Sequence, residues 1–313
     1  MSNTTNSLVS GIDPASFSAV TGPAQDLFRF VNGPWIDMYR LPDDRSRYGS
    51  FDKLAEDAEN QIRDILEEED CPATKSRALY KSFLDVDAID KAGLSAIESQ
   101  LDAIDKAEDK TSLTRALGAM NPTGGPDLLG IAVYGDPGAP ETNVIHIEQD
   151  GLGLPDEAYY REDHYAPIRE AYVDMVSKQL RNAHLAADTD DADAQAKRFL
   201  DVETRIASNH WDNVATRDSV KTYNPTDFAD LQATLADFDL GAWIEAWQTA
   251  YDATTAAAAQ PLDLRGSFEH TIVHEPSFLT GINAFWRETP LDDLKLWARV
   301  HVVIGSTLEL PHE

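Results

Sequence analysis

The sequence is poor in cysteine. Its 313 residues contain a single one, Cys71. One cysteine excludes an internal disulfide framework and a cysteine-based zinc finger, and it is typical of a reducing compartment. We therefore expect a cytoplasmic protein.

Basic residues are also scarce. Lysine and arginine total 26 against 55 aspartates and glutamates, which gives a formal net charge of −29. Such a chain repels phosphate backbones and anionic lipid headgroups, so we expect neither a nucleic-acid partner nor a membrane partner. The charge favours solubility and is typical of a salt-tolerant or generally acidic proteome.

Long apolar runs are missing. No segment is apolar for long enough to span a membrane, and the opening stretch MSNTTNSLVSGIDPASF has neither the basic region nor the apolar run of a secretory signal. The chain is nevertheless 42% hydrophobic, enough for a sizeable core. Its length allows one large domain or two smaller ones.

Recognisable catalytic motifs are missing as well. There is no glycine-rich phosphate loop, no G-x-S-x-G and no complete H-E-x-x-H. The stretch HEPSF starts like a zinc-protease helix at His274, but Phe278 stands where the second histidine is needed and Pro276 disfavours the helix. His270 is four residues before His274, yet residues 271–273 are all β-branched and indicate a strand, along which the two imidazoles would be roughly 13 Å apart. We therefore predict no catalytic and no metal-binding residue.

Two further patterns have ordinary explanations. Glu203 and His210 lie seven residues apart on a predicted helix, so we expect a buried hydrogen-bonded pair, with a catalytic pair as the alternative. The acidic run at 188–193 lacks the glycine of an EF-hand loop and is predicted to be a solvated turn.

Hydrophobic periodicity predicts a mainly α fold with a small β-hairpin. The hairpin pairs Leu128–Tyr134 with residues 143–148, and Ile272 and Val273 indicate one more short strand. Residues 24–40 are predicted to form a short helix, a turn at Asn32-Gly33-Pro34 and a second short element. The longer helices are predicted over 51–69, 74–84, 86–107, 111–119, 164–187, 190–212, 226–236, 240–256 and a last segment with Thr289 as its N-cap and Pro290 as its first residue. In the first of these, Leu54, Ala58, Ile62 and Ile65 share one apolar face.

Three segments together resemble the M13 family of zinc metallopeptidases, which includes neprilysin-like, endothelin-converting and bacterial PepO-like enzymes. They are DLFRFVNGPWIDMYRLPDDRSRYGSFDKLAEDAE at 26–59, GLGLPDEAYY at 151–160 and ETRIASNHWDNVATRDSVKTYNP at 203–225. Each resembles a stretch of the family, and they occur in the family's order.

The resemblance implies one lobe of a two-lobed endopeptidase that cleaves small peptides. In the family a thermolysin-like lobe carries the zinc ligands, and a mainly helical N-terminal lobe caps the active-site chamber. Residues 1–23 would then be an extended lead segment, 24–50 would pack beside the catalytic lobe, and 51–304 would form the multi-helical N-terminal lobe. Asn283-Ala284-Phe285-Trp286 superficially resembles a substrate-binding element of the catalytic half, but we predict a core-facing aromatic pair there.

Because H-E-x-x-H is missing, we expect the catalytic domain to be absent, residues 305–313 to be a truncated tail, and the chain to bind no cofactor and be inactive alone. Zinc and peptide substrates would belong to the full-length protein, together with the missing catalytic lobe as partner. The alternative is a stand-alone helical binding or scaffold protein that lost the peptidase half.

The resemblance also implies one substrate-binding residue, Arg47, in the stretch SRYGSFD. In the family this arginine contacts the C-terminal side of the bound peptide, and a guanidinium can hold a carboxylate through two parallel hydrogen bonds. The alternative is an arginine that bridges the two lobes or pairs with a nearby aspartate. Some relatives have a second arginine eight residues later, where this chain has Ala55.

Overall fold

The computed structural model describes residues 11–43, 45–255 and 262–311, which form two compact units, Met1–Tyr80 and Lys81–Glu313. The first ten residues of the predicted lead segment, the last two of the predicted tail and the last residue of the helix predicted over 240–256 lie outside the described residues. The mainly α class is confirmed. In the first unit the helices are α1 (Leu27–Met38), α2 (Ser50–Glu67) and the start of α3 (Thr74–Leu84).

Helix α1 corrects one prediction. It runs without a break through Asn32-Gly33-Pro34, where the sequence predicted a turn between two elements. Pro34 has no N–H to donate to the carbonyl oxygen of Phe30, four residues earlier. The N–H of Ser18 donates to that oxygen at 2.7 Å instead, so the helix continues without an unpaired acceptor.

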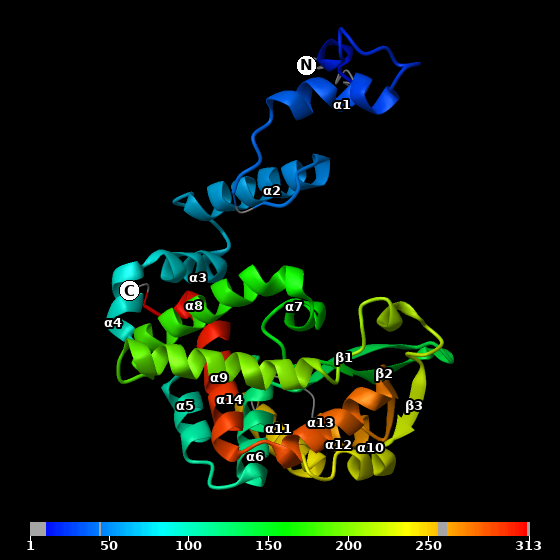
Figure 1. The fold of residues 1–313 in the computed structure, drawn as a ribbon. Coiled ribbons are helices and arrows are strands. Elements are labelled where there is room, and N and C mark those ends of the chain that lie inside the picture. The colour runs from blue at the N-terminus through cyan, green and yellow to red at the C-terminus, as the bar shows by residue number, and fades with distance from the viewer. Residues whose placement is uncertain (1–10, 44, 256–261, 312–313) are drawn as a thin grey trace. The chain divides into compact units, whose positions relative to one another are not determined.

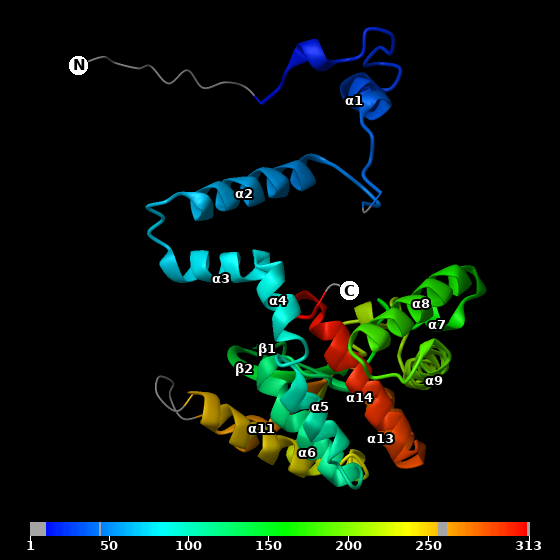
Figure 2. The same cartoon turned by 90° about the vertical axis from the view of Figure 1, so that its left-hand side faces the viewer.

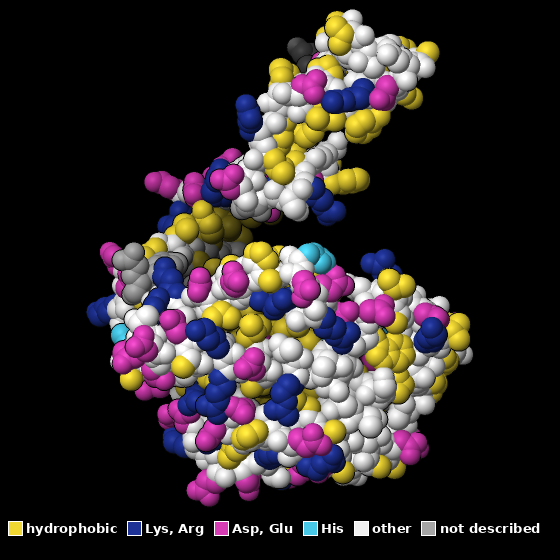
Figure 3. Space-filling model, viewed as in Figure 1, with side chains coloured by type: hydrophobic (Ala, Val, Ile, Leu, Met, Phe, Trp, Pro, Cys, Tyr) yellow, Lys and Arg dark blue, Asp and Glu magenta, His cyan; other side chains and the backbone are white. Residues whose placement is uncertain are grey.

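The first unit has almost no core of its own. Among its described residues only Gly33 and Cys71 are buried. Helix α2 forms where it was predicted, but its apolar residues are uncovered, with Leu54 exposed to 62% and Ile62 to 57%. Figure 3 shows hydrophobic side chains at the surface of this unit.

The second unit contains most of the helices and all of the described strands. Its helices, after the end of α3, are α4 (Val86–Ala92), α5 (Glu98–Asp105), α6 (Lys110–Met120), α7 (Ala158–Arg161), α8 (Ala166–Asn182), α9 (Thr189–Ala207), α10 (Phe228–Thr234), α11 (Leu240–Thr255), α12 (Leu264–Ser267), α13 (Pro276–Glu288) and α14 (Leu291–Gly305). Short 3₁₀ turns lie at Pro14–Ser16 in the first unit and at Asn121–Thr123, Asp163–Tyr165, Ala215–Arg217 and Thr307–Glu309 in the second.

The predicted hairpin is confirmed, and it is part of a larger sheet. Strands β1 (Leu129–Asp136) and β2 (Ala139–Gln149) are antiparallel, with Ile131 opposite Ile147. Strand β4 (His270–Val273) lies parallel to β2 and antiparallel to β3 (Asn224–Asp227), so the order is β1-β2-β4-β3. The sequence signalled β4 through Ile272 and Val273 but gave no signal for β3.

Helices pack against one another around a core rich in tryptophan. Trp243, Trp286 and Trp297 are fully buried. Helices α8 and α9 run side by side with α14 against them, and α6 lies along α11 (Figures 1 and 2). Phe285 and Trp286 on α13 are both buried, which confirms the predicted core-facing aromatic pair.

Several helix boundaries differ from the predictions. The helix predicted over 86–107 is two helices, because the chain turns at Gly93 with a positive φ of 58°. The acidic run at 188–193 is the start of α9 and no separate turn, since the Asp188 carboxylate caps the helix by accepting from the Asp191 N–H. Thr289 ends α13 and Pro290 is the N-cap of α14, so the predicted cap is off by one residue.

Candidate functional site

The carboxyl group of Glu203 is fully buried inside the second unit. Its side chain on α9 is fully buried and accepts hydrogen bonds from the Gly153 N–H at 2.8 Å, the Tyr160 hydroxyl at 2.8 Å and the Tyr172 hydroxyl at 3.3 Å. His301 Nε2 on α14 lies 2.9 Å from the same carboxyl group. Glu203 therefore ties together a loop and helices α7, α8, α9 and α14.

The predicted pair of Glu203 with His210 does not form. Helix α9 ends at Ala207, so the sevenfold spacing no longer puts the two residues on one helical face. His210 Nε2–H donates instead to the carbonyl oxygen of Asp150 at 3.0 Å. Burial lowers the pKa of His210 to about 4, which keeps its imidazole neutral near pH 7.

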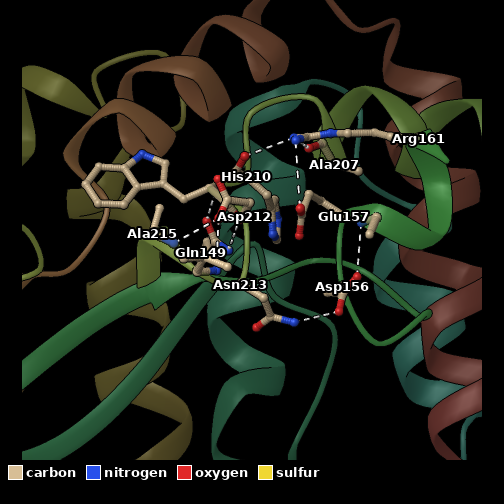
Figure 4. Close-up of polar contacts among 12 residues, drawn as sticks. Gln149, Asp156, Glu157, Arg161, Ala207, His210, Asp212, Asn213 and Ala215 are labelled. Carbon is tan, nitrogen blue, oxygen red and sulfur yellow. Dashed lines mark hydrogen bonds and ion pairs between the residues drawn. The ribbon is translucent and has the colours of Figure 1, made fainter. Parts of the chain in front are cut away.

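Arg161 caps the C-terminal end of helix α9. Its guanidinium donates to the carbonyl oxygens of Ala207 and, at 2.9 Å, His210, and it lies 3.9 Å from the Glu157 carboxylate (Figure 4). The last carbonyls of a helix have no partner within the helix, and a cation suits their partial negative charge. Arg161 therefore fixes the path of the chain where α9 gives way to a loop.

The same loop is held from two more sides. Gln149, at the end of β2, accepts from the Trp211 N–H at 2.7 Å and donates to the Trp211 carbonyl at 3.1 Å. Asp156 accepts from the Asn213 side-chain amide at 2.7 Å (Figure 4). The segments 151–160 and 203–225, which carry two of the three family-like patterns, thus form one polar junction.

Two histidines meet between strands β2 and β4. His146 Nδ1 and His274 Nε2 lie 2.8 Å apart, and His274 Nδ1 is 3.7 Å from the Glu148 carboxylate. His270 Nε2 instead lies 3.5 Å from the Asp136 carboxylate, at the other end of strand β4 from His274. Within residues 11–43, 45–255 and 262–311, no group of three or more histidine, cysteine, aspartate or glutamate side chains is arranged to hold a metal ion.

In the first unit, the surroundings of Arg47 are aromatic and charged. Arg45 pairs with Glu56 at 3.4 Å, and the Tyr48 hydroxyl donates to the same carboxylate at 2.6 Å, which raises the pKa of Tyr48. Arg47 is exposed and forms no hydrogen bond or ion pair with any described residue. The alternative of pairing with a nearby aspartate is therefore not seen among the described residues.

An aromatic stack lies next to Arg47 in the chain. The ring centroids of Trp35 and Tyr39 are 4.7 Å apart, and those of Tyr39 and Tyr48 are 4.5 Å apart. Beside the stack is a pocket of about 220 Å³, lined by Asn32, Trp35, Tyr48, Gly49, Ser50 and Lys53. The stack holds Tyr48, next to Arg47 in the chain, against helix α1 and the residue that follows it.

Sequence reasoning missed several residues that hold these sites together. The bonds of Tyr160 and Tyr172 to Glu203 and the close approach of His301 join positions far apart in the chain, and no local pattern signals them. Arg161 and Gln149 act on backbone groups, which leave no trace in side-chain spacing. The only usable signal was the helical position of Glu203, because a glutamate on a buried helical face needs partners.

The comparisons with known proteins point to one family. The sequence profile of the N-terminal region of peptidase family M13 matches residues 23–313. Human neprilysin is 29% identical over 238 residues, which cover 69% of this chain and 32% of neprilysin. Rat endothelin-converting enzyme 1 is 25% identical over 248 residues, covering 74% of this chain and 31% of that enzyme. The chain thus spans about a third of the length of these curated relatives.

Solved structures agree with this match. The crystal structure of Mycobacterium tuberculosis zinc metalloprotease ZMP1 with an inhibitor superposes with a TM-score of 0.84 at 31% identity, covering 97% of this chain and 45% of that one. PepO from Lactobacillus rhamnosis HN001 has a TM-score of 0.68 at 17% identity, covering 91% and 43%, and shares the fold. No helix in the described part of the chain is both long and apolar enough to cross a membrane.

The buried Glu203 generates a stability prediction. Glu203→Ala removes the acceptor of three donors and the neighbour of His301, so we expect the free energy of unfolding to fall by about 3–5 kcal/mol. Urea unfolding followed by circular dichroism measures this change. Glu170→Ala, an exposed glutamate on α8, is the matched control and should stay within about 0.5 kcal/mol of the wild type. Equal effects of the two substitutions would contradict the role given to Glu203.

His210 generates a prediction about pH. Its folded pKa of about 4 lies below the ordinary value of 6.5, so its contribution is complete above that ordinary value and is lost as the pH falls through about 4. His210→Gln can still donate to the Asp150 carbonyl but does not titrate. We expect the stability of the wild type relative to this variant to drop by about 3 kcal/mol between about pH 7 and about pH 4. A difference that is constant with pH in urea titrations would rule this out.

Proposed function

Because the chain belongs to peptidase family M13, we propose that it is the helical, substrate-facing lobe of a zinc metalloendopeptidase that cleaves small peptides. The observation that carries the proposal is the difference in length between this chain and the zinc metalloprotease that it resembles. The chain superposes almost entirely on a zinc metalloprotease but covers less than half of it, and it contains no H-E-x-x-H. We also propose a cytoplasmic location, because these 313 residues contain a single cysteine.

The chain's own residues do not fit the zinc ion of such an enzyme. The described residues offer no converging set of three ligands, and the sequence has no second histidine four residues after His274. Zinc, with the water that it activates, is therefore proposed to lie on a lobe outside residues 1–313. The role proposed for the present chain is to shape the chamber and to bind peptide.

The first unit supports a partner lobe. Apolar side chains on α1 and α2, including Phe28, Trp35 and Leu54, are exposed, and hydrophobic surface of this kind marks interaction sites. We propose that residues 24–50 pack beside the catalytic lobe. A stand-alone binding or scaffold protein is the alternative, and the separate core of the second unit favours it. An H-E-x-x-H reading frame downstream in the gene would decide between the two.

Arg47 is proposed to hold the C-terminal carboxylate of the peptide. Its guanidinium is exposed and has no carboxylate partner among the described residues, unlike Arg45, which pairs with Glu56. A free guanidinium is available for two parallel hydrogen bonds to a ligand. With Ala55 eight residues later, Arg47 would act without the second arginine found in some relatives.

Two activity measurements test the proposal. The purified 313-residue chain with added zinc should not cleave short unstructured peptides. Cleavage that a chelator abolishes would contradict the proposal. Combined with a catalytic lobe of the family, Arg47→Ala should lower kcat/KM by about ten- to a hundredfold for peptides with a free C-terminal carboxylate.

The controls separate charge recognition from general damage. Peptides amidated at the C-terminus lack the carboxylate, so Arg47→Ala should leave their kcat/KM nearly unchanged. Arg40→Ala removes another exposed arginine of the first unit and should change neither substrate class. Equal losses for free and amidated peptides would contradict a carboxylate-binding role for Arg47.

A further inference from the structure

Strand β1 is an outer strand of the sheet. The strand order β1-β2-β4-β3 places β1 at one edge and β3 at the other (Figure 1). An edge strand has one row of backbone groups without a neighbouring strand, and such a row can pair with another extended chain. The two edges of this sheet differ in how well they are protected.

The register identifies the free backbone groups of β1. The His274 N–H donates to the Ile147 carbonyl, so the backbone of Ile147 faces β4. Backbone direction alternates along a strand, and Ile145 and Ile147 therefore both face away from β1. Their partners on β1 are Val133 and Ile131. The N–H and C=O groups of Ile131 and Val133 consequently point outward at the edge.

No described residue satisfies these outward groups. The backbone hydrogen bonds formed outside the regular helices and strands include none at Ile131 or Val133. Val133 is 64% exposed and Tyr134 58% exposed, so this part of the strand is open. Two donors and two acceptors are available in a row.

The opposite edge, at β3, is protected against pairing with another strand, whereas the β1 edge is not. Strand β3 is short and contains Pro225, which has no N–H to offer. Strand β1 reads LGIAVYGD, with no proline, lysine or arginine to discourage pairing. The ladder becomes irregular only at Gly135 and Asp136, where the free edge ends.

We propose that the edge of β1 at Ile131 and Val133 binds an extended peptide as an added strand. The proposal rests on the proposed function, since it gives the substrate-facing lobe a peptide-binding surface of its own. The contacts are to backbone, so binding tolerates many side-chain sequences. An unstructured segment fits because it can become extended, whereas a folded helix has already paired its backbone groups.

Charge favours a basic peptide over a second copy of the chain. Each copy has a formal net charge of −29, so two copies repel one another, while a cationic peptide is attracted. Before the irregularity at Gly135, the outward groups come from Leu129, Ile131 and Val133, and the Leu129 N–H already donates to the Asp127 carboxylate. Such an edge is small for a stable dimer interface. The occupant is therefore an extended basic peptide.

The test is binding of a short fluorescein-labelled peptide that alternates valine and lysine, measured by fluorescence anisotropy with the full 313-residue chain. Val133→Pro removes an outward N–H without removing a bond of the β1–β2 ladder, because that N–H faces away from β2. We expect it to weaken binding by at least roughly two- to tenfold. Val133→Thr keeps both the N–H and the β-branch, so its affinity should match the wild type.

Amide hydrogen exchange gives a second readout that does not depend on the proline variant folding well. Saturating peptide should slow exchange at Ile131 and Val133 and leave Ala132, already bonded to β2, unchanged. Equal affinity of the proline and threonine variants, or protection confined to other segments, would overturn the proposal. So would slow exchange at these amides without peptide in a sample that sediments as a dimer, since a second copy would then occupy the edge.

The outcome is separable from that of the proposed function. Peptide binding to the β1 edge is measured on the chain alone and requires neither zinc nor cleavage. If the chain proved to be a stand-alone protein, binding at Ile131 and Val133 would still be observed. If the β1 edge did not bind peptide, we would still expect Arg47→Ala to lose carboxylate recognition in the activity assay.

Discussion

The buried carboxyl group of Glu203 is the interaction on which the arrangement of the second unit depends. A polar group removed from water costs several kcal/mol unless it finds partners, and a fully buried carboxyl group needs several. Glu203 meets this need with Gly153, Tyr160 and Tyr172, and His301 lies beside it. Satisfying one group therefore brings a loop and three other helices against α9.

The two units differ in how much apolar surface they bury. The second unit has tryptophan-rich packing and a satisfied polar centre, so its stability comes from within. The first unit buries only Gly33 and Cys71 among its described residues, and its apolar helical faces are open. A unit without a core gains little from folding alone, because burial of apolar surface is the main favourable term. A surface that covers α1 and α2 is what the first unit lacks, and the catalytic lobe of the family is the cover that we propose.

Local sequence patterns predicted the helices and strands better than they predicted the contacts between them. Helical periodicity identified most helices, and alternation identified the hairpin, because both depend on neighbouring residues. The turn predicted at Pro34 was wrong because the Ser18 N–H, distant in sequence, satisfies the acceptor that proline leaves. The pairing of Glu203 with His210 was wrong because α9 ends first at Ala207. The role given to Arg47 came from family resemblance alone, since an exposed arginine has no local signature, and it stays a prediction.

We propose that the first unit needs a second surface to become stable. Amide hydrogen exchange on the 313-residue chain, alone and with a catalytic lobe of the family, measures this need. We expect amides of α1 and α2 to exchange quickly in the lone chain and slowly when the lobe is added, while α8, α9 and α14 are protected in both samples. Strong protection of α1 and α2 in a lone, monomeric chain would contradict it.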